Sequence, residues 1–253
     1  LPPGREGEGA AEAAETAGAT IITMKVIDII NRAKETGKPR FSFELLPPLK
    51  GDGLDRIFGA IDRLMPFGPA FINVTCHREE MKYTERPDGL IEKHVMRRRP
   101  GTLGVSAAIR RKYGVEVVPH LICGGQSRYD IEDTLIDMDF LGIQNVLALR
   151  GDAMPGAHRF TPHAEGHAHA DQLVRQITAM NNGQFIDGEP NTNHRTDFCI
   201  GVAGYPEKHV ESPNSLTDLG YLKQKMDAGA EYIATQICYD ADTIIRFRDR
   251  CAE

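Results

Sequence analysis

The sequence has no long apolar run and no excess of positive charge. In its 253 residues, no uninterrupted apolar stretch approaches the roughly 18 residues that a membrane span requires. The formal net charge is −6, which gives neither nucleic acid nor an anionic membrane surface a reason to bind. We therefore expect no membrane and no nucleic acid among the partners of this protein.

The five cysteines include no C-x-x-C pair, and an odd number cannot all pair with one another. Free cysteine behaves as a small buried hydrophobe, so we expect reduced thiols and a cytoplasmic protein. The histidines His163, His167 and His169 have a spacing that could suit a metal, but no second cluster of ligands accompanies them. We therefore predict no metal site.

The first 23 residues lack the basic start and the continuous apolar core of a signal peptide. They consist mainly of Ala, Glu and Gly with few large apolar side chains, a composition typical of disorder. We expect a disordered leader over 1–23, with Met24 as a plausible start, and one catalytic barrel domain over 24–253.

The sequence also lacks the G-x-G-x-x-G fingerprint that a dinucleotide-binding Rossmann sheet carries after an early strand. From residue 41 onward, continuous apolar segments alternate with amphipathic ones. The strand-like segments are 41–46, 70–76, 116–123, 145–151, 199–206 and 232–238, and the helix-like segments are 54–68, 102–114, 131–142, 170–180, 216–229 and 241–251. Strands that are apolar at consecutive positions are typical of a parallel sheet covered on both faces.

Six strand–helix units indicate either an open doubly wound sheet or a (β/α)8 barrel. Because the Rossmann fingerprint is absent, we predict an α/β fold of the (β/α)8 TIM-barrel type, truncated after about six units with its C-terminal part missing. The charged run at 77–98 separates the second strand from its helix. We expect a mobile solvated loop there, and a role as a lid stays open.

Every predicted strand ends in or near a polar residue, namely Glu44, Thr75, His120, Asp152, Tyr205 or Gln236. In a β/α barrel the carboxyl ends of the strands form the rim that carries catalytic groups, so these residues predict a site. Glu44 is unusual because it lies in the apolar run FSFELLPP, where an unpaired charge is costly to bury. It is either a carboxyl kept protonated or a buried carboxylate that forms an ion pair with a strand-end arginine.

Seven segments of the chain, FSFELLPP, INVT, PHLIC, LALRGD, GYPEKH, LKQKMDAGA and ATQICYD, resemble those of methylenetetrahydrofolate reductase. The resemblance covers 24–253 and implies a bacterial-type catalytic barrel that binds FAD and uses NADH or NADPH. The implied reaction reduces 5,10-methylenetetrahydrofolate to 5-methyltetrahydrofolate by ping-pong hydride transfer through flavin N5, in one-carbon metabolism and methionine biosynthesis. We also expect a homo-oligomer.

The resemblance implies a role for each matching position. Glu44 matches the general acid of the family, and Asp152 matches the carboxylate beside the flavin and the pterin. Gln236 matches the glutamine that contacts folate and nicotinamide, and Thr75 matches a threonine that lines the nicotinamide and flavin site. The positions that match FAD contacts are Thr75, His120, Arg150, Gly151, Asp152, Ala170, Tyr205, His209, Asp218 and Lys225.

Two departures from the family affect packing around the cofactor. Cys76 stands where an aromatic residue often follows the threonine, and His169 stands where an aromatic residue often precedes the alanine.

Two other functions stay open. One is a β/α-barrel lyase or isomerase that uses Glu44 as a base, and the other is a non-catalytic barrel that binds folate or flavin. Arg150 and Asp152 could also form a purely structural ion pair.

Overall fold

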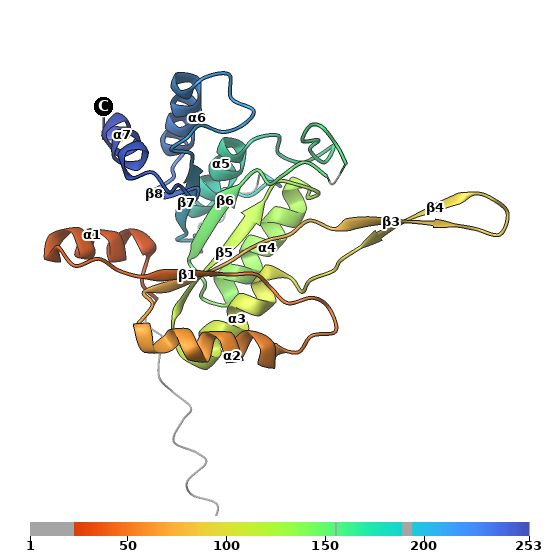
Figure 1. Ribbon diagram of the computed structural model, residues 1–253, viewed down its shortest axis with the longest axis horizontal. Coiled ribbons are helices and arrows are strands. Elements are labelled where there is room, and N and C mark those ends of the chain that lie inside the picture. The colour runs from red at the N-terminus through yellow and green to blue at the C-terminus, as the bar shows by residue number, and fades with distance from the viewer. Residues whose placement is uncertain (1–22, 155, 189–193, 253) are drawn as a thin grey trace, which may run out of the picture.

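A computed structural model describes residues 23–154, 156–188 and 194–252 (Figure 1). The leader expected over 1–23 lies, apart from Thr23, outside the described residues. Six parallel strands form one curled sheet in the order β1-β2-β5-β6-β7-β8. They are β1 (Ser42–Leu45), β2 (Phe71–Val74), β5 (Glu116–Ile122), β6 (Asn145–Leu149), β7 (Cys199–Gly204) and β8 (Tyr232–Thr235).

A helix follows each of these strands. The helices are α2 (Leu54–Leu64), α3 (Thr102–Tyr113), α4 (Arg128–Phe140), α5 (Ala170–Asn181), α6 (Ser215–Asp227) and α7 (Ala241–Ala252), and the 3-10 helix η1 (Met65–Phe67) extends α2. The main core lies between the helices and one face of the sheet, where Ile61, Ile109 and Leu135 are fully buried. The predicted α/β barrel architecture is thus confirmed for six units. Within the described ranges, no helix has the length and apolarity that a membrane crossing needs.

The other face of the sheet is closed at one end by a segment that sequence reasoning missed. Helix α1 (Val26–Thr36) precedes β1, and Val26 packs with Val118 and Leu147 in a second small core. Backbone N–H groups of Met24 and Val26 donate to Glu116 and Asn145, at 2.9 and 2.8 Å. Both acceptors begin their strands, so this segment covers the amino ends. The carboxyl ends stay accessible.

Strand β1 is not the buried strand that the apolar residues of FSFELLPP predict. Phe41 is 63% exposed, and the Glu44 side chain is 61% exposed. The reason is that β1 pairs only with β2 and forms an edge of the described sheet, as β8 does at the other edge. An edge strand has no neighbour on one side to cover its side chains.

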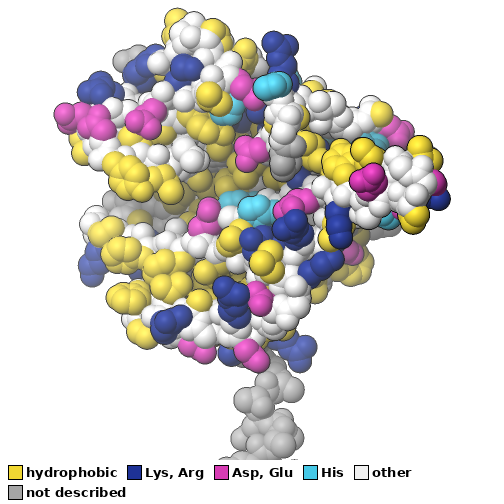
Figure 2. Space-filling model, turned by 45° about the vertical axis from the view of Figure 1, so that its right-hand side comes forward, with side chains coloured by type: hydrophobic (Ala, Val, Ile, Leu, Met, Phe, Trp, Pro, Cys, Tyr) yellow, Lys and Arg dark blue, Asp and Glu magenta, His cyan; other side chains and the backbone are white. Residues whose placement is uncertain are grey.

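The charged run at 77–98 forms a β-hairpin rather than the expected loop. Strand β3 (Glu80–Glu85) pairs antiparallel with β4 (Ile91–Met96), and a turn stabilised by a hydrogen bond from Gly89 N to Arg86 O joins them. Figure 1 shows this hairpin projecting from the body of the molecule, and Figure 2 shows apolar and charged side chains along it. Apolar and polar residues tend to alternate along each strand, as in a strand with two different faces. In a segment with charges of both signs this pattern is easily taken for a loop.

Candidate active site

A cleft with a volume of about 1020 Å³ opens at the carboxyl ends of the strands. Figure 2 shows it as a hollow across the molecule, with histidine, acidic and basic side chains along its walls. All twelve residues singled out from the sequence line this one cleft. The roles assigned to them stay predictions. The lining residues that sequence reasoning missed include His77, Arg78, Arg97, Arg98, Arg99, Glu211, Tyr221 and Gln224.

Glu44 lies beside His120, with 3.7 Å between Glu44 Oε2 and His120 Nε2. Burial, and to a lesser extent the charge of His77, lowers the pKa of His120 to about 4. His120 is therefore neutral at pH 7, and the contact is neither an ion pair nor, at this distance, a hydrogen bond. Buried His120 Nε2 has no hydrogen-bond partner among the described residues. An unsatisfied buried nitrogen in a cleft wall suits a ligand that can satisfy it.

His77 lies close enough to both predicted catalytic carboxylates, Glu44 and Asp152, for their charges to affect its pKa. Its pKa is lowered by burial and by Arg99, and the charges of Asp152 and Glu44 oppose that effect. His77 Nε2 lies 3.1 Å from Thr75 Oγ1, just beyond the end of β2. The cleft therefore brings residues from the ends of β1, β2 and β6 within electrostatic reach of one another.

The loop after β6 carries Asp152 in a defined backbone conformation. Gly151 has a φ of +83°, and a Cβ at this position would lie 3.3 Å from Ile122 Cβ. The left-handed region favours glycine, so Gly151 allows the sharp change of direction that presents Asp152 to the cleft. The carbonyl oxygen of Asp152 accepts a hydrogen bond from Arg78 Nη1 at 3.1 Å.

Arg78 is held by three different groups. Besides its bond to Asp152, its guanidinium lies 5.6 Å from the centre of the Phe160 ring, and its side chain passes close over Gly124. A Cβ at Gly124 would come within 2.8 Å of Arg78 Cδ. Arg78 could have been noticed from the sequence, because it stands only three residues after the strand-end Thr75.

Arg150 does not pair with Asp152, which corrects the alternative of a structural ion pair between them. Its guanidinium forms a bidentate salt bridge with Glu211, at 2.6 and 2.9 Å, and lies 4.9 Å from the centre of the Phe160 ring. The hydrogen bonds with Glu211 raise the pKa of Arg150, and those with Arg150 lower the pKa of Glu211. The guanidinium groups of Arg78 and Arg150 thus both lie near the Phe160 ring at one side of the cleft.

Helix α6 supplies Asp218 and Lys225, which both line the cleft. Asp218 organises the loop before α6, because its carboxylate accepts hydrogen bonds from His209 N at 3.2 Å and Ser212 Oγ at 2.5 Å. Lys225 Nζ donates to the carbonyl oxygen of Ala203. Burial lowers the pKa of Lys225 to about 8, against the opposing charge of Asp218. A lysine with such a pKa still carries its charge at pH 7.

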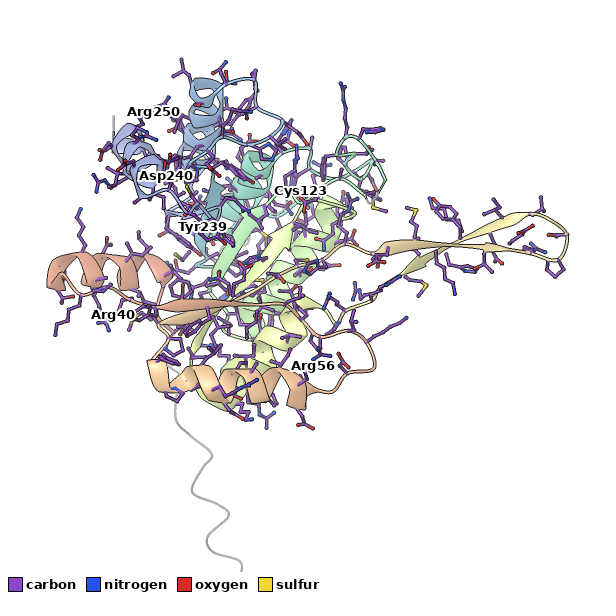
Figure 3. All side chains as sticks on the ribbon, viewed as in Figure 1. Arg40, Arg56, Cys123, Tyr239, Asp240 and Arg250 are labelled. Carbon is purple, nitrogen blue, oxygen red and sulfur yellow. The ribbon has the colours of Figure 1, made fainter. Side chains whose placement is uncertain are left out.

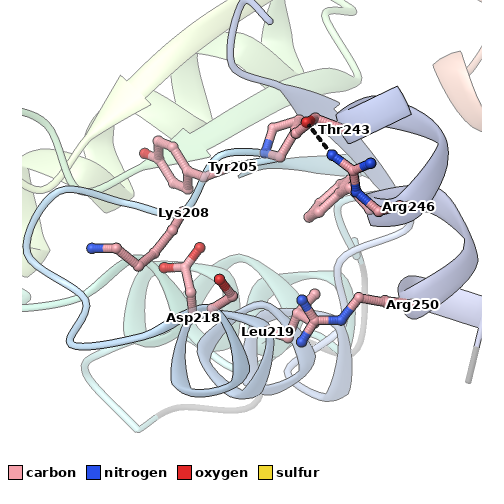
Figure 4. A pocket seen from close by; sticks show the side chains of 10 residues that line it. Tyr205, Lys208, Asp218, Leu219, Thr243, Arg246 and Arg250 are labelled. Atoms are coloured by element: carbon pink, nitrogen blue, oxygen red, sulfur yellow. Dashed lines mark hydrogen bonds between the residues drawn. The ribbon is translucent and has the colours of Figure 1, made fainter. Parts of the chain in front are cut away.

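A smaller cavity of about 200 Å³ lies between α6 and α7, next to the cleft (Figure 4). Tyr205 and Asp218 line both spaces. The cations Lys208, Arg246 and Arg250 also line the smaller cavity. The larger cleft is thus continued toward α7 by a short, mainly basic extension.

In the histidine-rich loop His167 contacts a glutamine of α5, and burial raises the pKa values of the buried cysteines. His167 Nε2 lies 2.6 Å from Gln176 Oε1, and no group of metal-ligating side chains occurs within the described residues. All five cysteines are free. Burial raises the pKa of Cys123, labelled in Figure 3, to about 12, so its thiol stays protonated.

The fold and the cleft define a β/α-barrel protein with a polar site at the carboxyl ends of its strands. A family model described as methylenetetrahydrofolate reductase matches residues 29–253. The chain therefore belongs to the methylenetetrahydrofolate reductase family.

Curated relatives carry the same family name. A probable methylenetetrahydrofolate reductase (NADH) of Oryza sativa subsp. japonica is 36% identical over 239 residues, which are 91% of this chain and 35% of the rice protein. The 5,10-methylenetetrahydrofolate reductase of Escherichia coli is 30% identical over 226 residues, covering 88% of this chain and 64% of the relative. The chain thus spans about a third of the plant relative and less than two thirds of the bacterial one.

Solved structures resemble the chain in fold alone. A 2,3-dimethylmalate lyase gives a TM-score of 0.51 at 10% identity, covering 91% of this chain and 68% of the lyase. A phosphonopyruvate hydrolase gives 0.52 at 12% identity, covering 91% of this chain and 70% of the hydrolase. Both are barrel enzymes, and at these identities they carry no information about the reaction.

Proposed function

We propose that this chain carries the catalytic cleft of an FAD-dependent methylenetetrahydrofolate reductase. The reaction is the reduction of 5,10-methylenetetrahydrofolate to 5-methyltetrahydrofolate, with NADH or NADPH as the reductant. The observation that carries the proposal is the gathering of twelve family-matching residues around one cleft. We also place the enzyme in the cytoplasm, because its five cysteines are free thiols.

The donor set of the cleft fits FAD. Lys225 supplies positive charge for the two phosphates, while Arg150 lines the cleft in a salt bridge with Glu211. Helix α5 begins at Ala170 on the cleft wall, where a helix N-terminus favours anions. The buried Nε2 of His120 has no partner among the described residues, so a polar group of a ligand can satisfy it. The volume of about 1020 Å³ lies at the upper end of ordinary ligand pockets, as an extended dinucleotide requires.

FAD, when bound, supplies the acceptance and delivery of a hydride. The protein must deal with the charge and the proton that folate reduction involves. Opening the five-membered ring of the substrate breaks the bond between the methylene carbon and N10, and leaves an iminium cation at N5. The carboxylate of Asp152, presented to the cleft by Gly151, provides negative charge beside that cation.

Glu44 provides the proton that N10 needs as it leaves. The Glu44 side chain stands in the cleft wall and is accessible, so it can reach a substrate atom directly. Neutral His120 beside it adds no positive charge that would hold Glu44 as a fixed ion pair. Glu44 at the end of β1 and Asp152 in the loop after β6 thus reach the cleft from different elements of the fold.

Glu44→Gln tests the proposal. Glutamine keeps the size of the side chain but cannot supply a proton, so NADH or NADPH should still bleach the bound flavin at close to the normal rate. Folate reduction should fall by about 10²–10⁴-fold, as expected for the loss of a general acid. Stopped-flow absorbance of the two half-reactions measures this, and equal slowing of both would remove Glu44 from the role of acid.

Flavin binding and hydride transfer to folate distinguish the reductase from the other two functions left open by the sequence. A lyase or isomerase should bind no flavin, so purified protein would be colourless and would not take up added FAD. A non-catalytic member should bind flavin, and even bleach it, without passing a hydride to folate. The family match favours the reductase over the lyase.

A further inference from the structure

The β3–β4 hairpin, residues 80–96, has two chemically different faces. Residues directly opposite each other in an antiparallel pair lie on the same face, and alternate residues lie on opposite faces. One face carries Glu80, Lys82, Thr84, Glu92, His94 and Met96. The other, here called the apolar face, carries Met81, Tyr83, Glu85, Ile91, Lys93 and Val95.

The apolar face is uncovered. Tyr83 is 63% exposed, Ile91 71% and Val95 59%. The hydroxyl of Tyr83 contacts Met81 Sδ on the same face at 3.8 Å, so these side chains already form a continuous surface. Figure 1 shows that the hairpin projects into solvent, away from the helices that could cover it. A two-stranded ribbon is marginally stable on its own, and a contiguous exposed apolar surface marks an interaction site.

The charges on the apolar face make it complementary to itself. It carries one acid, Glu85, and one base, Lys93, and neither forms an ion pair within the described residues. By contrast, Glu92 and His94 on the polar face lie 3.5 Å apart, and Glu80 is paired with Arg98 at 2.7 Å. When two copies of the apolar face meet around a twofold axis, each Glu85 can approach a Lys93 of the other copy. Every unpaired charge then gains a partner.

We propose that the apolar face of the β3–β4 hairpin is a dimerisation surface whose occupant is the same hairpin of a second copy of this chain. Tyr83, Ile91 and Val95 form the apolar centre of the contact, and Glu85 and Lys93 fix its register. In the register of the hairpin, Lys93 stands opposite Tyr83 and Glu85 stands opposite Ile91, so the contact combines aromatic and aliphatic side chains with two charges. It does not depend on the reaction proposed for the cleft.

Sedimentation velocity of the full chain over a concentration series tests this surface. The wild-type chain should show a monomer–dimer equilibrium. Tyr83→Lys and Ile91→Lys should each weaken dimerisation at least about tenfold, as expected for residues in the centre of an interface. Lys82→Glu, which reverses a charge on the polar face of the same strand, is the matched control and should leave the equilibrium unchanged. Circular dichroism checks that each variant keeps its fold.

Charge reversal tests the pairing of the two copies. Glu85→Lys alone and Lys93→Glu alone should each prevent dimerisation, because like charges then meet across the contact. An equimolar mixture of these two variants should dimerise again, since the introduced lysine of one copy meets acidic groups of the other. Restoration in the mixture cannot arise within a single hairpin.

Three outcomes would overturn the proposal. A wild-type chain that stays monomeric at all concentrations would show that the hairpin binds no second copy. A dimer unaffected by Tyr83→Lys and Ile91→Lys would place the contact elsewhere, for example at the sheet edges β1 and β8. A mixture of the two charge variants that stays monomeric would reject the pairing of Glu85 with Lys93.

Discussion

His120 should make the stability of the folded chain depend on pH in a narrow window. Its side chain is only 7% exposed, and Nε2 has no hydrogen-bond partner among the described groups. Burial therefore disfavours the charged imidazolium in the folded state but not in the unfolded chain. The pKa of His120 is about 4 in the folded chain and 6.5 in the unfolded chain, so the unfolded chain binds the proton more tightly. Acidification through this window must favour unfolding.

The size of the effect follows from the two pKa values. At about 1.4 kcal/mol for each pH unit, the difference between 6.5 and about 4 corresponds to about 3 kcal/mol of unfolding free energy. This stability is fully present above pH 6.5 and is lost as the pH falls toward 4. Carboxyl groups also titrate in this range, so the effect of His120 is the difference between the wild type and a variant that lacks the imidazole.

Urea unfolding of the flavin-free protein, followed by circular dichroism at several pH values from 7 to 4, measures the difference. His120→Gln should show a shallower loss of unfolding free energy on acidification, by about 3 kcal/mol across the window. His94→Gln, at an exposed position on the hairpin, is the control and should parallel the wild type. Parallel curves for all three proteins, or an NMR titration of folded His120 near pH 6.5, would refute the reasoning.

Three further substitutions test the cleft. Because the pKa of Lys225 is about 8, FAD affinity measured by flavin fluorescence should fall up to about tenfold between pH 7 and 9, and Lys225→Arg should remove that dependence. Asp152→Asn should retain FAD but slow the folate half-reaction by on the order of 10²-fold in stopped-flow absorbance; unchanged folate turnover would contradict its role. Arg78→Ala should speed amide hydrogen exchange in residues 151–154, measured by mass spectrometry, because Asp152 loses its guanidinium partner; unchanged protection there would show that Arg78 does not hold the loop.

The order of strands and helices could be predicted from the sequence because each element carries its own periodicity. The cleft could be predicted too, since the carboxyl ends of parallel strands meet at one edge of a sheet, and Glu44, His120 and Asp152 all stand at such ends. The residues within each segment were sufficient for these inferences. They needed only the rule that successive strands of the repeat lie parallel.

What could not be predicted depends on partners distant in sequence. The exposure of Glu44 follows from the edge position of β1, which is a property of the assembled sheet. Helix α1 is anchored through bonds from Met24 and Val26 to Glu116 and Asn145, which lie about a hundred residues later in the chain. The hairpin was missed for a different reason. Its apolar face alternates with a polar one, so the composition of 77–98 resembles that of a solvated loop.

The hairpin and the cleft are mechanically connected through Arg78, which lies just before β3. Its bond to the Asp152 carbonyl, its position over the Phe160 ring and its close passage over Gly124 fix the start of the hairpin against the loop that carries a predicted catalytic carboxylate. A rigid displacement of the hairpin that carried Arg78 with it would break these contacts together. The start of the hairpin and the loop that carries Asp152 are therefore joined by direct contacts of one side chain.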